Sequence, residues 1–144
     1  MILYVDTSAL LKRYTLEIGS SEFATLIAQA NPVGTTLVTR AEIAAALAKA
    51  VRTKTLTSAE AAVALKAFRV QWPDLAHIQV SETLVAKAES LAWDYGLRGY
   101  DALHLAAALV WQESLDRAIV LATFDRQLWE TGQKAGLTVW PDTL

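Results

Sequence analysis

Short apolar runs alternate with longer segments in which apolar residues recur at helical spacing along this chain of 144 residues. The apolar runs predict five short strands, at residues 2–5, 35–38, 75–80, 119–124 and 137–140. The segments between them predict helices, the longest at residues 40–52, 57–72, 81–95 and 98–109. Because strands and helices alternate throughout, the pattern favours an α/β fold. We expect a three-layer α/β/α arrangement in which helices cover both faces of a mostly parallel central sheet of about five strands.

The starts of several helices can be predicted from residues that cap them. Residues 57–60 read Thr-Ser-Ala-Glu, which is the capping-box pattern at a helix start. Thr39 is expected to cap the helix that follows it, and Ser20 or Ser21 to cap the helix before Asn31. The two helices between residues 40 and 72 are joined by only a few residues, so they should form an antiparallel hairpin.

The segment from Arg98 to Leu109 predicts a nearly uncharged helix that carries one carboxylate, Asp101, in its first turn. An acid in a first turn interacts favourably with the helix dipole, which is a sufficient structural reason for it. The residues after Asp101 are almost all leucine or alanine, however, and such a helix is typical of a domain centre, where an uncompensated charge is costly. We therefore expect that a cation lies near Asp101 or that this helix start opens into a cleft.

Three further acids lie at or near the ends of predicted strands. Asp6 and Asp125 each follow an apolar run directly, and Glu42 comes shortly after a third run. Ligands of an open parallel sheet bind in the crevice outside the carboxyl ends of the strands, so these acids and Asp101 are expected to converge on one site. Four carboxylates in one place repel one another, and a divalent cation that prefers oxygen ligands relieves that repulsion. The quartet therefore predicts a metal site, although each acid alone would be interpreted as a helix cap or dipole partner.

Length and composition limit the other possibilities. The chain has the size of one domain, residues 1–144, and with 53% hydrophobic residues it can bury a sizeable core. It has no cysteine and only two histidines, which excludes disulfides and thiolate or histidine-rich metal sites, so any metal must be held by oxygen. No apolar segment reaches the length of a membrane span and no signal peptide is visible, so we expect a cytoplasmic protein without membrane association.

The formal net charge of -2 argues against a broadly basic surface for nucleic acid. Four arginines are nevertheless close in sequence to the proposed site. Arg40, Arg98 and Arg126 lie within three residues of one of its acids, and Arg13 is in the helix after Asp6. These arginines are expected to form a local cationic rim that binds substrate phosphates. Exposed loops also carry arginine for solubility alone, so both interpretations stay open.

Several other polar and aromatic residues have a structural and a functional interpretation. Ser8 and Thr123 lie beside two of the acids and are expected to support a carboxylate or a metal-bound water, although each would also fit a turn. His104, one turn after Asp101, is more typical of a packed, hydrogen-bonded core residue than of a general base. The five tryptophans are spread over separate elements and are expected mainly to pack or to line protein interfaces rather than to stack on bases.

Four short motifs carry the acidic quartet in order along the chain. They are Val-Asp-Thr-Ser-Ala-Leu at residues 5–10, Arg-Ala-Glu-Ile at 40–43, Tyr-Asp-Ala-Leu-His-Leu-Ala at 100–106 and Thr-Phe-Asp-Arg-Gln-Leu at 123–128. Their order and spacing, and the length of the chain, resemble those of PIN-domain nucleases, most closely the VapC-type toxins of bacterial and archaeal toxin–antitoxin pairs. The resemblance covers essentially the whole chain, and no acidic position of the pattern is missing.

The resemblance implies a PIN-like fold and a metal-dependent endoribonuclease. Its catalytic residues would hold Mg²⁺ or Mn²⁺, directly or through water, so that an activated water hydrolyses an RNA phosphodiester bond; they are Asp6, Glu42, Asp101 and Asp125. The resemblance also implies a small cognate antitoxin that blocks the site, and homodimerisation through other helices. We expect the antitoxin in an apolar groove between the early helices and the hairpin, whose apolar side chains exceed what surface helices need: Leu16, Ile18, Phe23, Val63, Leu65 and Phe68.

Three other classes of protein fit the chain less well. A haloacid-dehalogenase-like phosphatase needs a second Asp two residues after Asp6, where this chain has Ser8. A phospho-receiver domain needs paired acids after its first strand and another acid after its third, where this chain has Ser81 and Glu82. A catalytically silent PIN-like binding module would share the fold, but it would normally have lost one or more of the acids. The intact quartet therefore favours a nuclease.

Overall fold

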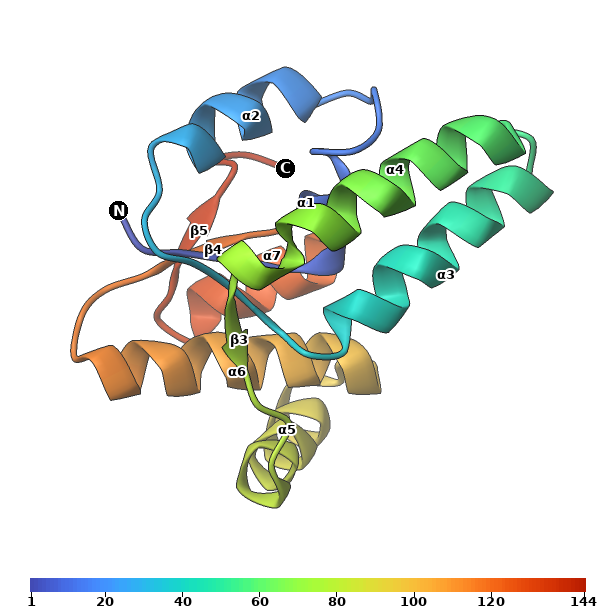
Figure 1. Ribbon diagram of the computed structural model, residues 1–144. Coiled ribbons are helices and arrows are strands. Elements are labelled where there is room, and N and C mark those ends of the chain that lie inside the picture. Colours follow the sequence, from blue (N-terminus) through green and yellow to red (C-terminus); the bar gives the residue numbers. More distant parts are fainter.

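A computed structural model describes all 144 residues and has a five-stranded sheet at its centre (Figure 1). The strands are β1 (Leu3–Val5), β2 (Val33–Thr36), β3 (Ala76–Ile78), β4 (Val120–Ala122) and β5 (Thr138–Trp140). Their order across the sheet is β3-β2-β1-β4-β5, and every neighbouring pair is parallel. The predicted α/β class and parallel sheet are confirmed, and the strands are shorter than most of the apolar runs that predicted them.

Helices cover both faces of the sheet. They are α1 (Thr7–Leu11), α2 (Ser20–Ala28), α3 (Thr39–Arg52), α4 (Ser58–Gln71), the 3₁₀ turn η1 (Trp72–Asp74), α5 (Glu82–Tyr95), α6 (Gly99–Leu115) and α7 (Arg126–Lys134). The helices from α1 to α4 pack into one core cluster and those from α5 to α7 into another, with the sheet between them (Figure 1). This is the expected three-layer arrangement.

The central strand β1 divides its side chains between the two cores. Leu3 and Val5 belong to the cluster with α1 to α4, whereas Tyr4 and the preceding Ile2 belong to the cluster with α5 to α7. All four are at most 5% exposed. Successive strand residues point to opposite faces, so a strand buried on both sides is apolar throughout, and the polar tip of Tyr4 is an exception that needs a partner.

The alanine-rich helix α6 is buried, as its sequence predicts. Seven consecutive residues, 102–108, are buried. The last part of α6 also packs closely on the sheet: a Cβ on Gly34 of β2 would come within 2.6 Å of the Trp111 ring, so any larger residue at this position would force the ring to shift. Although α6 has 17 residues, neither it nor any other helix is long and apolar enough to cross a membrane.

The helices α3 and α4 form the expected hairpin, which projects from the sheet (Figure 1). The hydroxyl of Thr57 accepts a hydrogen bond from the backbone N–H of Glu60 at 3.1 Å, and the Glu60 carboxylate accepts one from the Thr57 N–H at 2.9 Å. The predicted capping box is therefore confirmed. It satisfies two N–H groups that the first turn of α4 would otherwise leave unpaired.

The region between β2 and α3 differs from the prediction. β2 ends at Thr36 and the chain turns at Leu37, so the strand lies two residues earlier than expected. Val38 takes the N-cap position and Thr39 is the first residue of α3, so the predicted cap at Thr39 is wrong. Its hydroxyl instead lies 2.7 Å from that of Thr35 in the core. The buried partner gives this hydroxyl the hydrogen bond that capping would have given it.

The predicted serine cap of α2 is also wrong. Gly19 occupies the N-cap with a φ of 90°, a left-handed conformation that glycine adopts without strain, and Ser20 and Ser21 are the first residues of the helix. The Ser20 hydroxyl donates to the backbone carbonyl of Thr15 at 2.8 Å and so stabilises the loop between α1 and α2. The helix α1 ends at Leu11, so Arg13 lies just after the helix in which it was expected.

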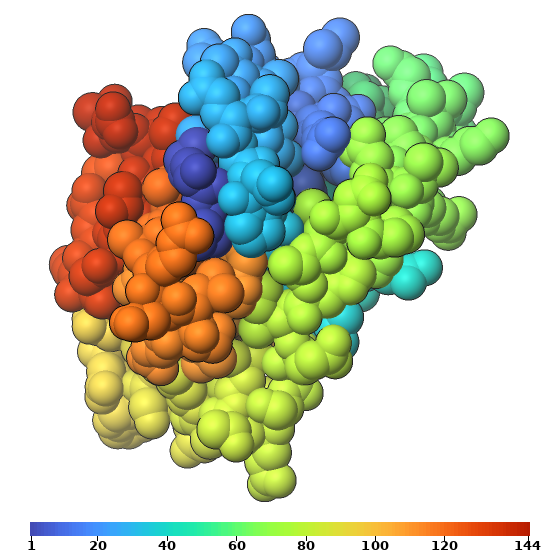
Figure 2. Space-filling view, turned by 60° about the vertical axis from the view of Figure 1, so that its left-hand side comes forward, coloured from blue at the N-terminus to red at the C-terminus, as the bar shows by residue number.

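Two residues expected in an apolar surface groove belong to the core instead. Phe23 is 0% exposed and Phe68 is 1% exposed, both in the cluster with α1 to α4. In contrast, Leu16, Ile18 and Val63 are 100%, 96% and 71% exposed. Figure 2 shows α2 (light blue) and α4 (green) on one face of the molecule. The prediction of a surface groove is therefore wrong for the two phenylalanines. The apolar side chains that are exposed lie on the loop before α2 and on the outer side of α4.

Four of the five tryptophans are packed against the rest of the protein, as expected. Trp72 is buried, and Trp111, Trp129 and Trp140 are partly buried against the two cores. Trp93 on α5 is the exception, because its side chain is 89% exposed.

Candidate active site

The carboxyl ends of all five strands meet at one edge of the sheet, because every pair is parallel. Asp6 follows β1, and Asp125 follows its neighbour β4. In the sheet, β2 and β3 lie on one side of β1, and β4 and β5 lie on its other side. The topological switch point is therefore between β1 and β4, and Asp6 and Asp125 lie at the carboxyl ends of these two strands. Such switch points are the usual ligand sites of open parallel sheets.

The carboxylate of Asp6 is buried and held on both oxygens. Its Oδ1 accepts hydrogen bonds from the backbone N–H of Ala9 at 2.9 Å and from the Ser8 hydroxyl at 2.8 Å. Its Oδ2 accepts one from the Thr123 hydroxyl at 2.7 Å. Burial raises the pKa of Asp6, and the nearby His104 and these hydrogen bonds oppose the rise. Ser8 and Thr123 thus contact the carboxylate, which is one of the two contacts expected for them.

Thr123 also connects Asp6 to the next acid. Its hydroxyl accepts a hydrogen bond from the backbone N–H of Asp125 at 3.0 Å while it donates to Asp6. The Asp125 carboxylate caps α7 by accepting from the N–H of Leu128 at 2.9 Å. Asp6 and Asp125 are therefore helix caps, as the simplest interpretation of each acid suggests, and they are also neighbours in one hydrogen-bonded network.

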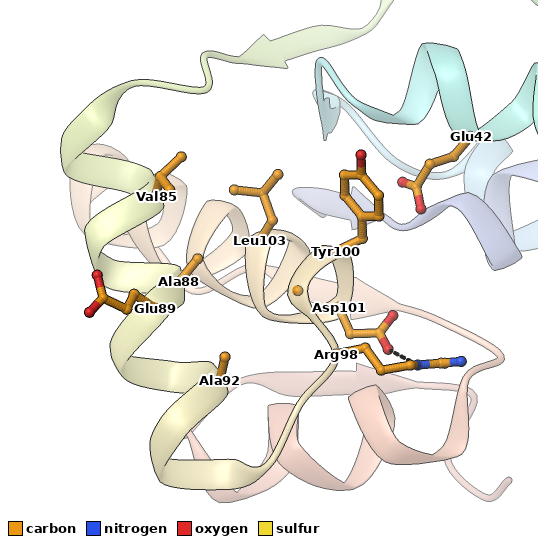
Figure 3. Close-up of a pocket in the computed structure, with 10 residues that line it drawn as sticks. Glu42, Val85, Ala88, Glu89, Ala92, Arg98, Tyr100, Asp101 and Leu103 are labelled. Carbon is orange, nitrogen blue, oxygen red and sulfur yellow. Dashed lines mark hydrogen bonds and ion pairs between the residues drawn. The ribbon is translucent and has the colours of Figure 1, made fainter.

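Asp101 and Asp125 are joined through Arg98, the residue at the N-cap of α6. Arg98 donates from Nε to Oδ2 of Asp101 and from Nη2 to Oδ2 of Asp125, each at 3.0 Å. Figure 3 shows the contact with Asp101 at the mouth of a pocket. Burial and the charge of Asp125 raise the pKa of Asp101, and Arg98 opposes them. A cation thus lies beside Asp101, as the apolar character of α6 predicted.

Glu42 lies in the first turn of α3 and is held by two other elements. Its Oε1 accepts hydrogen bonds from the Thr7 hydroxyl of α1 at 2.8 Å and from Nε2 of His104 in α6, at 2.7 Å. Burial alone would raise the pKa of Glu42, but His104 and Thr7 outweigh it, so the pKa lies below its usual range. His104 is only 2% exposed and has a second partner, the hydroxyl of Tyr4. It is therefore the packed, hydrogen-bonded core residue that the sequence predicts.

Glu42 and Asp101 line the same pocket, which has a volume of about 720 Å³ and lies between α5 and the start of α6 (Figure 3). Its apolar side is formed by Val85, Ala88 and Ala92 of α5 and by Leu103. The start of α6 therefore opens into a cleft, which is the second of the two alternatives expected for Asp101.

The four predicted arginines do not form a common rim. Arg98 contacts two of the acids, but the guanidinium of Arg40 lies over the ring of Trp72, 5.9 Å from its centroid. Arg13 lines two cavities beside α2 and η1 and has no contact with the quartet. Arg126 is exposed at the start of α7 without a side-chain partner.

Thr7 and Tyr4 are part of the network, although the sequence did not single them out. Thr7 follows Asp6 directly, so its position next to an acid was a usable signal. Tyr4 is the one polar-tipped residue in an otherwise apolar strand. Its partner is 100 positions away, which the sequence pattern cannot show.

Comparisons with known proteins show the family and the fold of this chain. The family model described as PIN domain matches residues 3–134. Ribonuclease VapC45 of Mycobacterium tuberculosis is 34% identical over 143 residues, which cover 99% of this chain and 97% of that protein. The match to the crystal structure of PAE2754 from Pyrobaculum aerophilum covers 96% of this chain and 83% of the PAE2754 chain, with 22% identity and a TM-score of 0.65. The match to a toxin–antitoxin complex from Klebsiella pneumoniae covers 83% of this chain and 84% of the matched chain, with 17% identity and a TM-score of 0.55.

The chain therefore belongs to the PIN-domain family, and within that family it is similar to the VapC ribonucleases. The resemblance carried by its four motifs is confirmed.

Proposed function

We propose that this chain is a Mg²⁺- or Mn²⁺-dependent endoribonuclease and the toxin of a toxin–antitoxin pair, and that residues 1–144 form its single PIN domain. The observation that carries the proposal is the linkage of the acids at the carboxyl edge of the sheet. Thr123 joins Asp6 to Asp125, and Arg98 joins Asp125 to Asp101. Glu42 shares the cleft with Asp101.

The family relationship supports RNA as the substrate. The relative from Mycobacterium tuberculosis is named a ribonuclease, and this chain matches it over nearly its whole length. An RNA substrate is consistent with the cytoplasmic location that we propose for this activity.

The donor atoms suit a hard divalent cation. All four acids offer carboxylate oxygens, the chain has no cysteine, and both ring nitrogens of His104 already have partners. No three acidic or imidazole side chains stand close enough together to hold a metal ion in the present arrangement. The guanidinium of Arg98 lies between two of the carboxylates instead, so these positions already hold a positive charge. Arg98 would have to turn outward for one ion to contact several acids.

Two acids of the site, Asp6 and Asp101, have distinct proposed roles. A bound Mg²⁺ or Mn²⁺ would lower the pKa of a water molecule and would offset negative charge on the phosphate. Asp6 is fixed by Ser8 and Thr123, so it provides a carboxylate that cannot rotate away. Asp101 keeps Oδ1 without a protein hydrogen bond and faces the cleft, so it is placed to accept a proton from the attacking water.

Arg98 is placed to contact the substrate backbone. It is 74% exposed and holds its guanidinium at the mouth of the cleft. Once its carboxylate partners bind a metal ion, the guanidinium is free to donate to a phosphate next to the scissile bond. Arg126 and Arg40 remain candidates for more distant phosphates, and Arg13 is the least suitable of the four because it lies beside α2.

The exposed apolar residues suggest where the antitoxin binds. Leu16 and Ile18 on the loop before α2, and Val63 and Val70 on α4, are 70–100% exposed. Exposed apolar side chains that gather on one face of a protein mark candidate interaction surfaces. The solved complex from Klebsiella pneumoniae is a toxin–antitoxin complex of the same fold. We propose that an amphipathic segment of the antitoxin covers these residues.

Homodimerisation is proposed to involve a different surface. Trp93 on α5 is 89% exposed, although tryptophan normally buries most of its area. A second copy of the chain packed on α5 would cover it. Light scattering of Trp93→Glu alongside the parent protein would show whether the dimer is lost.

A PIN-like binding module without catalysis is the main alternative, and the site disfavours it. Each of the four acids is present, and every one is held by at least one hydrogen bond from another residue. A haloacid-dehalogenase-like phosphatase remains unsuitable, because Ser8 occupies the position of its second Asp and is bonded to Asp6.

The test is cleavage of single-stranded and structured RNA by the purified protein. Activity is expected with Mg²⁺ or Mn²⁺ and none with EDTA, and adding Mg²⁺ back in excess should restore it. Cleavage at an unchanged rate in EDTA would contradict the proposal.

A further inference from the structure

A line of buried side chains runs from the central strand to the acidic site. The hydroxyl of Tyr4 lies 2.9 Å from Nδ1 of His104, and Nε2 of the same ring lies 2.7 Å from Oε1 of Glu42. Tyr4 is 0% exposed and His104 is 2% exposed. The two rings meet edge to face, with centroids 6.0 Å apart and an angle of 75° between their planes. Only Glu42 connects this line to the cleft.

The hydrogen-bond partners determine where the imidazole carries its proton. A neutral His104 protonated at Nδ1 would turn the lone pair of Nε2 towards the carboxylate of Glu42, and two acceptors at 2.7 Å repel each other. A neutral ring protonated at Nε2 avoids this, because the Tyr4 hydroxyl can donate to Nδ1 while Nε2 donates to Glu42. A doubly protonated ring also donates from Nε2. In both acceptable states Nε2–H donates to Glu42.

Both donors to Glu42 use the same oxygen. Oε1 accepts from His104 and from the Thr7 hydroxyl, whereas Oε2 accepts no hydrogen bond from the protein. The carboxylate is thus fixed from α1 and α6 at once, and its second oxygen is left for a ligand in the cleft. Carboxylates and imidazoles that bind a metal ion are commonly oriented by hydrogen bonds to the atoms that do not face the metal.

We propose that His104 is a positioning residue that fixes Glu42 with Oε2 towards the cleft, and that Tyr4 holds the His104 ring in place from its Nδ1 side. The inference rests on the proposed function, because it assigns these residues to the proposed metal site.

Packing alone does not account for the pair. His104 is surrounded by leucine and alanine in α6, and Tyr4 lies among aliphatic residues in β1. A leucine and a phenylalanine at these positions would fill similar space without polar atoms to satisfy, and burying polar atoms is costly unless each has a partner. The pair satisfies all of its polar groups only by including Glu42.

Two kinds of measurement test this role without depending on turnover. Long-range ¹H–¹⁵N NMR spectra of the histidine rings should show a proton on Nε2 of His104 in the parent protein. In Tyr4→Phe the Nε2 proton should remain, because Glu42 still accepts from it, whereas the Nδ1 signal should shift, because its partner is lost. Titration with Mn²⁺ should show affinity about 10-fold to 100-fold weaker in His104→Leu, which is the usual effect of losing such a partner. His104→Gln should retain most of the affinity, because its amide can still donate to Glu42.

His77→Gln is the matched control. His77 is partly buried, whereas His104 is buried, and its ring also has a hydrogen bond, to the backbone carbonyl of Trp72 at 2.9 Å, but it has no contact with the acids. Its replacement should leave the Mn²⁺ affinity unchanged. If His104→Leu does not fold, Tyr4→Phe and His104→Gln still decide the question, since both keep the shape of the core.

The outcomes separate this inference from the proposed function. If the parent protein binds Mn²⁺ and His104→Leu binds it equally well, the positioning role is wrong and the proposed function stands. A neutral His104 ring protonated at Nδ1 would also overturn the role. If the parent protein neither binds Mn²⁺ nor cleaves RNA, both the proposed function and this inference are wrong.

Discussion

Arg98 donates a hydrogen bond from Nη2 to Oδ2 of Asp125, 27 positions along the chain, at 3.0 Å. The same guanidinium contacts Asp101, so one exposed arginine pairs with two carboxylates of the site and offsets one of their two negative charges. The arginine and a divalent cation would compete for these two acids.

Arg98→Ala is therefore expected to bind Mn²⁺ a few-fold more tightly than the parent protein at low salt, because the competing cation is gone. Its KM for RNA should rise, because a phosphate contact is lost. Arg117→Ala, which removes an exposed arginine far from the acids in the loop before β4, is the control. Isothermal titration and initial rates provide the two values, and weaker Mn²⁺ binding in Arg98→Ala would contradict the competition.

Asp6→Asn should leave the metal-free fold as stable as the parent or more stable, by up to about 1–2 kcal/mol at neutral pH. Burial raises the pKa of Asp6 in the folded state, so its charged form destabilises the fold at pH values above that raised pKa, and the amide carries no charge. Part of this gain is offset, because the amide replaces a carboxylate oxygen that accepts from Thr123.

Millimolar Mg²⁺ should reverse that ranking. A ligand that binds only the folded state stabilises it by RT ln(1 + [L]/Kd), and the variant's Kd should be larger. Thermal melts of both proteins in EDTA and in Mg²⁺ give the four values. If Asp6→Asn is clearly less stable in EDTA and Mg²⁺ raises both melting temperatures equally, Asp6 is a helix cap and not a metal ligand.

The apolar residues near α2 and α4 can be separated by mutation into core and surface. Phe68→Ala should destabilise the fold by about 3–5 kcal/mol, since Phe68 is 1% exposed and its removal leaves a cavity. Val63→Asp should leave the stability of the isolated protein nearly unchanged, because this side chain is 71% exposed.

The same Val63→Asp variant should co-purify with much less antitoxin when both proteins are produced together, since it places a charge in the proposed interface. Arg69→Asp, which also introduces an acid at an exposed position but on a different side of α4, is the control. Full recovery of antitoxin with Val63→Asp would show that the interface lies elsewhere.

The sequence predicted best what depends on local pattern. The parallel sheet, the buried helix α6 and the capping box at Thr57 were all predicted from period and spacing. The position of the acids at strand ends and first turns followed from the same pattern, and the expected contact of Ser8 with its neighbouring acid is present.

The features that were missed depend on contacts distant in sequence. Thr39 does not cap α3, because Thr35 offers it a buried partner. Phe23 and Phe68 looked like groove residues, since periodicity shows which face of a helix is apolar but not whether another element covers it. Tyr4 and His104 are hydrogen-bonded although they are 100 positions apart. The arginines also have different partners, because Arg98 contacts two acids whereas Arg40 lies over the ring of Trp72.

Replacement of Asp101 tests the central claim most directly. Asp101→Asn keeps the shape of the side chain and removes an anionic oxygen ligand, and Asp116→Asn makes the same chemical change at the other end of α6, where a φ of 48° suits asparagine. RNA cleavage in Mg²⁺ should be abolished in Asp101→Asn and unchanged in Asp116→Asn, with both proteins folded by circular dichroism. Cleavage by folded Asp101→Asn at the parent rate would contradict an acidic metal site at the carboxyl edge of the sheet.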